Sequence, residues 1–300
     1  MTTVIPAEIT CEGERGLQRR LGWFVLGLAG LTWLLMGLGS ATRVMNAGLA
    51  CPDWPLCYGT LWPNMNLEIF LEWFHRLVAA TVGSMTLVLL GTSWIYRRLV
   101  PGWLPWAAGG LVALVGIQGL LGGLTVTELL RFDIVTAHLG TGLLFFLGLL
   151  TVGYGLLRGS WGRGCWFSGV AWGAAAVIYL QSLLGALVAS RWAVHQCLSG
   201  VEATLCQVLN SHLLGVVPAT LAVLLTLGLG IWQRRHPLLL TLVGLLLVGQ
   251  LALGWGTFSL RLQVEPLTVA HQMVGAALLG SLVVLGLMAR HGQLYEAEHG

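Results

Sequence analysis

The stretch from Ile134 to Leu157, IVTAHLGTGLLFFLGLLTVGYGLL, decides the fold class of this chain. It contains no Asp, Glu, Lys or Arg, and it exceeds the ~20 residues that a helix needs to cross a bilayer. One histidine, His138, lies near its start. The stretch therefore predicts a membrane-spanning helix that carries a functional polar side chain into the membrane.

Similar apolar stretches flank this one, so we expect eight spans in total. They cover roughly residues 21–42, 73–96, 104–127, 134–157, 166–189, 209–232, 238–258 and 267–289. Of the 300 residues, 56% are hydrophobic and 9% are charged, whereas a soluble domain has about 25% charged residues. We expect an all-α membrane protein that faces the lipid bilayer. A net charge of +3, scattered along the chain, argues against a nucleic-acid partner.

The arginines predict the orientation of the chain in the membrane. All 15 cationic residues are arginine, and most lie in the N-terminal segment and in alternate loops. Because such segments stay on the cytoplasmic side, we expect cytoplasmic ends at residues 1–20 and 291–300. The long loops that contain the cysteines would then lie on the outer face. The arginine-rich start lacks a small-residue cleavage site, so we expect no cleaved signal.

Arginines and histidines mark a repeat. Each odd-numbered span ends in an outer arginine, and each even-numbered span has a histidine in its first turns, at His75, His138, His212 and His271. Three odd-numbered spans share the phrase Gln-x-x-Leu-Gly, at residues 118–122, 181–185 and 250–254. Long and short outer loops alternate, so the repeating unit is four helices, used over residues 21–160 and 161–290. Repeats in one orientation predict two four-helix bundles about a pseudo-two-fold axis along the membrane normal.

The four membrane histidines predict haem binding. Neutral imidazole is a common axial ligand of haem iron, and helical bundles build cofactor sites from facing helices. His75 with His138, and His212 with His271, would each form a bis-histidine iron site. Zinc or copper would require ligands that converge tightly, often with cysteine or carboxylate among them. The alternative is four structural histidines that hydrogen-bond between helices.

The outer cysteines form two groups. Cys51 and Cys57 share the first outer loop, and Cys197 and Cys206 share the third. The outer face is oxidising, so we expect one disulfide in each loop. These disulfides are interpreted either as loop staples or as redox-active groups in electron or haem handling, and the spacing leaves both open.

A carboxylate lies one helical turn before the first histidine, in the sequence Glu72-Trp-Phe-His75-Arg76. Residues at i and i+3 are neighbours on a helix, so Glu72 could take up a proton during chemistry at a bound haem. The alternative is an acid that favours a helix N-terminus. Arg43 and Arg76 are candidates for bidentate pairing with haem propionates, although cations also suit helix C-termini.

These motifs resemble the first half of bacterial haem A synthases. The resemblance rests on GSATRV at residues 39–44, AGLACPDWPLC at 47–57 and EWFHR at 72–76, and it weakens in the second half. It implies eight helices in two halves, and oxidation of a methyl group of haem O to the formyl group of haem A for terminal oxidases. His75 and His138 would hold haem O or haem A, with Glu72 as the catalytic carboxylate.

The same resemblance implies a resident haem b on His212 and His271. The first cysteine pair would matter for activity and the second mainly for structure. Haem O synthase and an unidentified electron acceptor or donor are the partners implied. One departure is that Leu213 follows His212, where Arg76 follows His75, so the two halves are not equivalent.

Two other functions share parts of this pattern. A di-haem cytochrome b would use the four histidines but would need neither Glu72 nor the cysteine pairs. A membrane thiol oxidoreductase would use the cysteines and treat the histidines as structural. Extraction of the bound pigments distinguishes these functions from haem A synthesis.

Overall fold

The structure is a computed structural model that describes residues 7–159, 165–189, 203–261 and 263–299. Within these ranges, side chains are described for residues 13–159, 165–189, 207–261 and 263–290. Eight helices occupy the described part of the chain, namely α1 (Ala7–Val44), α2 (Leu67–Ile95), α3 (Leu104–Thr127), α4 (Phe132–Arg158), α5 (Trp166–Ala189), α7 (Ala203–Trp232), α8 (Pro237–Ser259) and α9 (Glu265–His299).

Each of these helices contains a segment long and apolar enough to cross a membrane. The prediction of an all-helical protein with eight membrane-spanning helices is therefore confirmed. Several helices extend beyond the predicted spans: α1 begins at Ala7 rather than near residue 21, α9 ends at His299 rather than near 289, and α2 begins at Leu67 rather than near 73. The Asn66 side chain caps this helix by accepting a 2.8 Å hydrogen bond from the backbone N–H of Ile69. The capped turn lengthens α2 beyond its apolar run, so Glu72 lies inside the helix.

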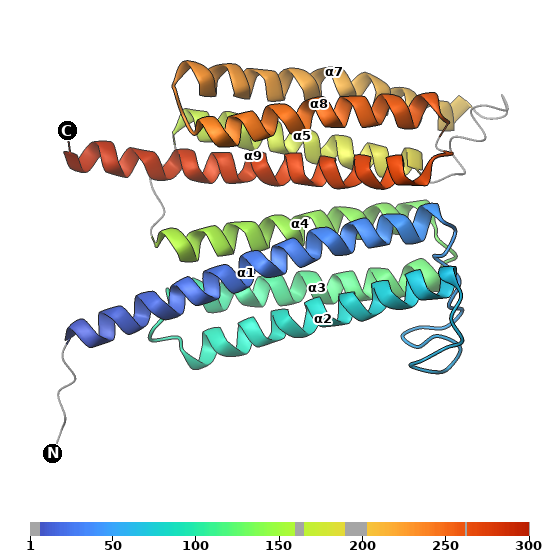
Figure 1. Cartoon of the computed structure of the whole chain (residues 1–300), viewed down its shortest axis with the longest axis horizontal. Helices are drawn as coiled ribbons and strands as arrows, with labels where there is room; N and C mark the ends of the chain where they lie inside the picture. The colour runs from blue at the N-terminus through green and yellow to red at the C-terminus, as the bar shows by residue number, and fades with distance from the viewer. Residues whose placement is uncertain (1–6, 160–164, 190–202, 262, 300) are drawn as a thin grey trace.

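The helices form two groups that lie side by side, α1–α4 and α5–α9 (Figure 1). Within each group the contacts close a ring, because α1 and α3 both pack on α2 and α4, while α5 and α8 both pack on α7 and α9. The groups meet where α9 packs on α1 and α4, and where α4 packs on α5. The division into residues 21–160 and 161–290 as domains, and the pseudo-two-fold axis, stay predictions.

Apolar packing fills both the first group and the seam. Leu28, Leu89, Phe145 and Leu149 are fully or almost fully buried in the first group. A second cluster joins α4 to all four helices of the other group, through Leu143, Ala175, Val223, Val243 and Leu279. Hydrogen bonds also cross the seam, among them one from Trp33 Nε1 to Met273 O at 3.0 Å and one from Gln272 Nε2 to Met36 O at 3.3 Å. The two groups therefore share one packed interior.

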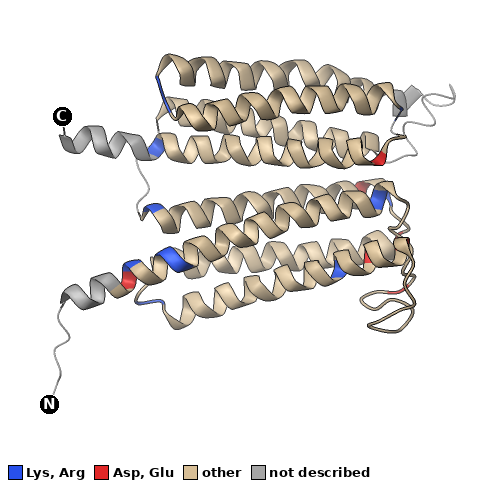
Figure 2. Ribbon diagram, viewed as in Figure 1, with Lys and Arg blue, Asp and Glu red and all other residues tan. Residues whose placement is uncertain are grey.

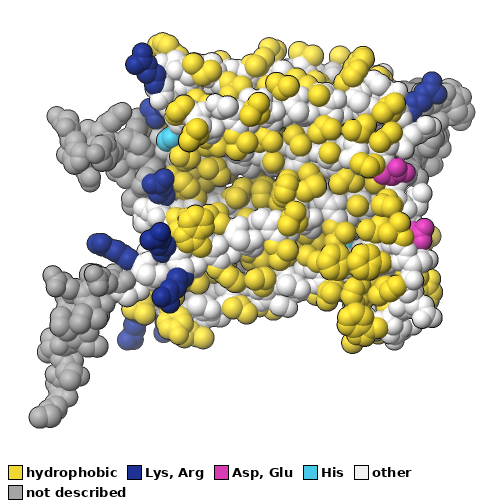
Figure 3. Space-filling view, viewed as in Figure 1, with side chains coloured by type: hydrophobic (Ala, Val, Ile, Leu, Met, Phe, Trp, Pro, Cys, Tyr) yellow, Lys and Arg dark blue, Asp and Glu magenta, His cyan; other side chains and the backbone are white. Residues whose placement is uncertain are grey.

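Charged side chains gather at the two ends of the helices. Figure 2 shows most of the arginines near the end that carries both termini, and Figure 3 shows hydrophobic side chains over the flank between the ends. We refer to the opposite end, where the segment between α1 and α2 lies (Figure 1), as the loop end. An apolar flank between polar ends fits an integral, multi-pass membrane protein. Which end faces the cytoplasm stays a prediction.

Candidate functional site

All four predicted histidines lie toward the loop end of their helices. They are half-buried and come from the even-numbered spans, as His75 on α2, His138 on α4, His212 on α7 and His271 on α9. The rings of His75 and His138 lie within electrostatic reach of each other, and so do those of His212 and His271. Each group of helices therefore carries one of the predicted pairs, and the binding of iron by either pair stays a prediction.

Each histidine ring faces a glycine on the preceding span. A Cβ atom added to the glycine would stand 2.9 Å from Nε2 of His75 at Gly39, and it would stand 3.5, 3.0 and 3.0 Å from Cε1 of the ring for the pairs Gly122–His138, Gly185–His212 and Gly254–His271. Real Cβ atoms are rarely as close to another side chain as at Gly39, Gly185 and Gly254, so these three glycines provide the space in which the rings lie, whereas the distance at Gly122 is an ordinary contact. Gly122, Gly185 and Gly254 end the repeated Gln-x-x-Leu-Gly phrase.

The glutamines that begin the phrase contact the same histidines. Gln118 Nε2 donates to the backbone carbonyl of His138 at 2.7 Å. Gln181 Nε2 donates to the carbonyl of His212 at 2.7 Å and lies 3.1 Å from its ring Nδ1. Gln250 Nε2 lies 3.3 Å from Nε2 of His271. The sequence identified this phrase only as a sign of repetition, although glutamine and glycine one turn apart indicate a shared helix face.

The donor set suits haem better than a bare metal ion. In the described part of the chain, no three His, Cys, Asp or Glu side chains converge as metal ligands. A pair of imidazoles would instead suit haem, because the porphyrin already supplies the other nitrogen ligands of the iron. The buried Nδ1 atoms of His138 and His271 have no hydrogen-bond partner among the described residues. Buried polar atoms without partners are uncommon and indicate rings arranged for a ligand.

The loop between α1 and α2 is closed by a disulfide. Cys51 and Cys57 are bonded, with their Cα atoms 4.7 Å apart, and both are buried. This confirms the first predicted pair. The second pair cannot be compared with the structure, because Cys197 and the side chain of Cys206 lie outside the described residues. Cys165 is a free thiol whose sulfur lies 3.6 Å from the carbonyl oxygen of Ala289.

The Glu72 carboxylate binds this loop. It is only 4% exposed, and its Oε2 accepts a 2.8 Å hydrogen bond from the backbone N–H of Cys51. Its Oε1 accepts a 2.6 Å bond from Nη2 of Arg76, one turn further along α2. Glu72, which the sequence suggests as a proton acceptor, is therefore held by the Arg76 cation on one side and by the disulfide loop on the other.

Arg76 fastens the loop from the same helix. Its guanidinium donates to the backbone carbonyls of Cys51, Asp53 and Leu56. Asp53 in turn accepts hydrogen bonds from the N–H groups of Tyr58 and Gly59, at 2.6 and 2.8 Å. The bond from Gly59 is the main cause that lowers the pKa of Asp53 below its usual value, and Tyr58 and Arg76 add to it. Loop, disulfide and carboxylate thus form one connected structure.

The two arginines proposed for propionates occupy different surroundings. Arg76 is engaged with the loop, whereas Arg43 at the end of α1 reaches the seam, where its Nη2 lies 3.5 Å from Gln272 Oε1. The Nε atom of Arg43 is buried and has no hydrogen-bond partner among the described residues. Gln272 directly follows His271, so Arg43 lies between the two histidine pairs. Propionate binding by either arginine stays a prediction.

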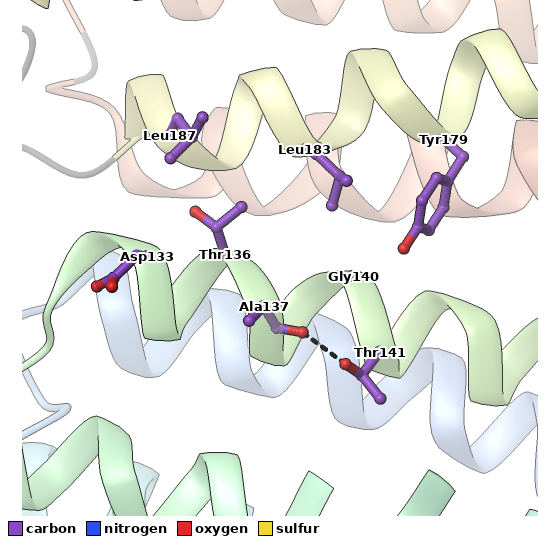
Figure 4. A pocket seen from close by; sticks show the side chains of 8 residues that line it. All are labelled: Asp133, Thr136, Ala137, Gly140, Thr141, Tyr179, Leu183 and Leu187. Carbon is purple, nitrogen blue, oxygen red and sulfur yellow. Dashed lines mark hydrogen bonds between the residues drawn. The ribbon is translucent and has the colours of Figure 1, made fainter. Parts of the chain in front are cut away.

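A cavity of ≈ 380 Å³ lies apart from the histidines, between α4 and α5. Figure 4 shows Tyr179 and Leu183 of α5 pointing toward Gly140 of α4. Asp133 and Thr141 line the same cavity, and Thr141 Oγ1 donates to the carbonyl of Ala137. The four histidines are not among its lining residues. The cavity is therefore a feature of the seam between the two groups, and α4 turns His138 toward α3.

A comparison with protein families identifies the family of the chain. The family COX15-CtaA, described as cytochrome oxidase assembly protein, matches over residues 22–69 and 64–207, which is more than half of the chain. The protein belongs to this family. The match includes the disulfide loop, Glu72, His75 and His138, and it ends before His212. The region that matches the family thus contains the most specific motifs of the sequence.

Curated relatives of this COX15-CtaA protein carry one recurring name. A protein of Sphingopyxis alaskensis named "Heme A synthase" is 28% identical over 222 residues, which cover 61% of this chain and 61% of the relative. One from Caulobacter vibrioides with the same name is 30% identical over 200 residues, covering 54% and 58%. A Schizosaccharomyces pombe protein named "Heme A synthase-mitochondrial ferredoxin fusion protein" is 24% identical over 195 residues, covering 51% and 32%.

These similarities do not extend over whole proteins. The aligned part of the chain spans about three fifths of the length of the first bacterial relatives that it matches. Family membership is therefore established for the chain. Its activity, its substrate and its partners are matters of proposal, which must be argued from its own residues.

Proposed function

We propose that this protein is a haem A synthase, an oxidoreductase that converts a methyl group of haem O into the formyl group of haem A for terminal oxidases. One observation carries the proposal. The Glu72 carboxylate lies one helical turn before His75, in the group of helices that also carries His138, and it is held by Arg76 and by the disulfide loop. A di-haem cytochrome that only transfers electrons does not require a fixed carboxylate at this place.

In this proposal the two histidine pairs have different tasks. His75 and His138 hold the substrate haem O, and they release it as haem A. His212 and His271 hold haem b, which supplies electron transfer to the reaction when bound. Both pairs lie toward the loop end of a shared, packed interior. Family membership supports a role in the assembly of cytochrome oxidase.

Glu72 is the proposed proton acceptor. When water supplies the oxygen atom, R–CH3 and H2O become R–CHO with the release of four protons and four electrons, and the electrons pass to a redox acceptor. Each carboxylate oxygen of Glu72 accepts one hydrogen bond from the protein, and each keeps acceptor capacity for a water molecule or a proton. Arg76 balances the negative charge, so the carboxylate is fixed in place before the substrate arrives. A fixed, oriented base is worth about 10²–10⁴-fold in rate.

The electrons require a redox partner. The fission-yeast relative is named as a fusion with a mitochondrial ferredoxin, which supports a small iron–sulfur protein of this kind as the partner. Haem O, an apolar compound that partitions into the membrane, would come from haem O synthase. The arginine-rich end that carries both termini would face the cytoplasm, and the disulfide loop would face outward.

Pigment analysis tests the proposal. The full chain is purified from cells that also make haem O, and the bound haems are extracted and separated by chromatography. We expect haem A or haem O beside haem B. Haem B alone would overturn the proposal in favour of a di-haem cytochrome b, and protein without any haem would overturn it in favour of a thiol oxidoreductase.

A further inference from the structure

Three of the four histidines are held by a glutamine and glycine on the preceding span, a pair that we call the brace. The braces are Gln118 with Gly122, Gln181 with Gly185, and Gln250 with Gly254. In each brace the glutamine amide contacts either the backbone carbonyl or the ring of the histidine, and the glycine lies next to the Cε1 atom of that ring. Backbone and ring are therefore restrained from the same neighbouring helix.

A second glycine accommodates each glutamine. On the helix of the histidine, about one turn after it, Gly142, Gly215 and Gly275 lie directly against the amides of Gln118, Gln181 and Gln250. A Cβ atom at these three positions would stand 3.0, 2.2 and 3.0 Å from the nearest amide atom. Any larger residue there would displace the glutamine. Three separate helix pairs thus share the same complementary set of side chains.

The first histidine has no such brace. The residue four positions before Gly39 is Leu35, whose side chain has no amide, and the residue one turn after His75 is Ala79. The His75 ring also lies differently, because its Nε2 atom rather than Cε1 is nearest to Gly39. On the α1 side His75 is therefore restrained by packing alone. The other three histidines are also hydrogen-bonded to a glutamine, His138 through its backbone carbonyl, His271 through its ring and His212 through both.

We propose that Gln118, Gln181 and Gln250 are positioning residues that fix three axial histidines, and that unbraced His75 is the ligand that detaches when haem exchanges. Partners that hold a ligating histidine fix its orientation, and their loss typically weakens metal binding by about 10–100-fold. When one ring nitrogen binds iron the other carries the proton and donates it, so the amides of Gln181 and Gln250 would then turn their oxygen toward the ring. The inference rests on the haem sites of the proposed function and deepens it. Two braces retain haem b between His212 and His271, whereas a single brace leaves the substrate site able to open.

Haem release measures this difference directly. Gln181→Leu and Gln250→Leu remove the amide from the haem b site, and Gln18→Leu is the matched control, because Gln18 contacts Leu99 O at the opposite end of the bundle. Each full-length protein is loaded with haem b, and the transfer of haem to excess apomyoglobin is timed. We expect release about 10–100-fold faster from the two brace variants and unchanged release from the control.

A spectrum distinguishes positioning from general loosening. In ferric haem with two axial histidines, the largest electron paramagnetic resonance g value depends on the angle between the imidazole planes. The brace variants should shift this g value in the haem that remains bound. An unchanged g value together with wild-type release would overturn the brace, even if the proteins contain less haem.

The reverse change adds a brace to His75. The double variant Leu35→Gln, Ala79→Gly places an amide at residue 35 and removes the methyl group of Ala79, which leaves room for that amide. We expect haem O to leave this variant about tenfold more slowly than the wild type. Unchanged release from a folded double variant would overturn the role of His75, and if this variant does not fold, Gln118→Leu decides, since it should speed haem O release without affecting haem b.

One further variant separates the two proposals. His212→Ala removes an axial ligand, so it should lose haem b whether or not the braces matter. If His212→Ala retains haem b at the wild-type level, the proposed haem sites are wrong and the brace fails with them. If His212→Ala loses haem b while Gln181→Leu behaves as the wild type, only the brace is wrong.

Discussion

Replacement of Glu72 by Gln separates the two tasks that the structure gives to this side chain. Glu72 anchors the disulfide loop through Cys51 and Arg76, and it is the proposed proton acceptor. Glutamine has the same length and still offers an oxygen to the N–H of Cys51, but it carries no charge and no useful basicity. The anchoring task is therefore partly kept and the chemical task is removed.

The cost to stability follows from the ion pair. The side chains of Glu72 and Arg76 are 5% and 15% exposed, and removal of one partner of a buried pair typically costs about 3–5 kcal/mol. Arg76 keeps the carbonyls of Cys51, Asp53 and Leu56 as acceptors, so its charge stays solvated by the loop. We expect a loss of about 1–3 kcal/mol and a protein that still folds.

The cost to activity is larger. Loss of an oriented base lowers the rate by about 10²–10⁴-fold. We expect Glu72→Gln to retain haem b and to bind haem O, yet to make almost no haem A when haems extracted from the membranes are separated and quantified. Asp133→Asn is the matched control, because Asp133 is a half-exposed carboxylate shortly before His138, paired with Arg131. An exposed pair contributes about 0–1 kcal/mol, so this variant should make haem A normally.

Three results would contradict this reasoning. Near-normal haem A from Glu72→Gln would reduce Glu72 to an anchor for the loop. Loss of haem A from Asp133→Asn, with Glu72→Gln active, would move the proton acceptor to α4. Loss of haem b from Glu72→Gln would show that the two histidine pairs are not independent.

Three more predictions concern the site. Peptide mapping without reductant should find Cys51 bonded to Cys57 and Cys165 free, and serine at Cys51 and Cys57 should lower the unfolding free energy by about 2 kcal/mol; free thiols at both would contradict the loop. Gly185→Ala brings a Cβ within 3.0 Å of His212, so haem b content should fall about tenfold, while Gly169→Ala, with nothing within 4 Å, should retain it. His212→Ala or His271→Ala should lose haem b, whereas His75→Ala or His138→Ala should keep haem b and stop haem A production; equal loss from all four would contradict the division of tasks.

Much of the fold follows from the sequence because the membrane imposes length and apolarity on every span. The start of α2 was predicted too late because Glu72 interrupts the apolar run, and the cap at Asn66 extends the helix past it. The pairing of histidines was also predictable, since alternate spans end at the same side of the membrane. The depth of each histidine in its span and the order of the spans along the chain were sufficient for that inference.

The contacts of the site depend on features that periodicity does not reveal. The hydrogen bonds from Arg76 to the loop were not predicted. Besides Glu72, its acceptors are three backbone carbonyls whose positions depend on turns such as Tyr58 and Gly59, both with positive φ. The function of Gln181 was missed for a similar reason. The sequence places it one turn from Gly185, but only packed helices show that both meet His212.

The most direct test of haem A synthesis is the conversion itself. Membranes containing the protein, together with a ferredoxin and its redox partner enzyme, are supplied with haem O, and the product is identified by mass spectrometry after extraction. We predict that haem A accumulates with the wild type and that His75→Ala, assayed in parallel, produces none. Haem O that stays bound to the wild-type protein and is recovered unchanged would contradict the proposed function.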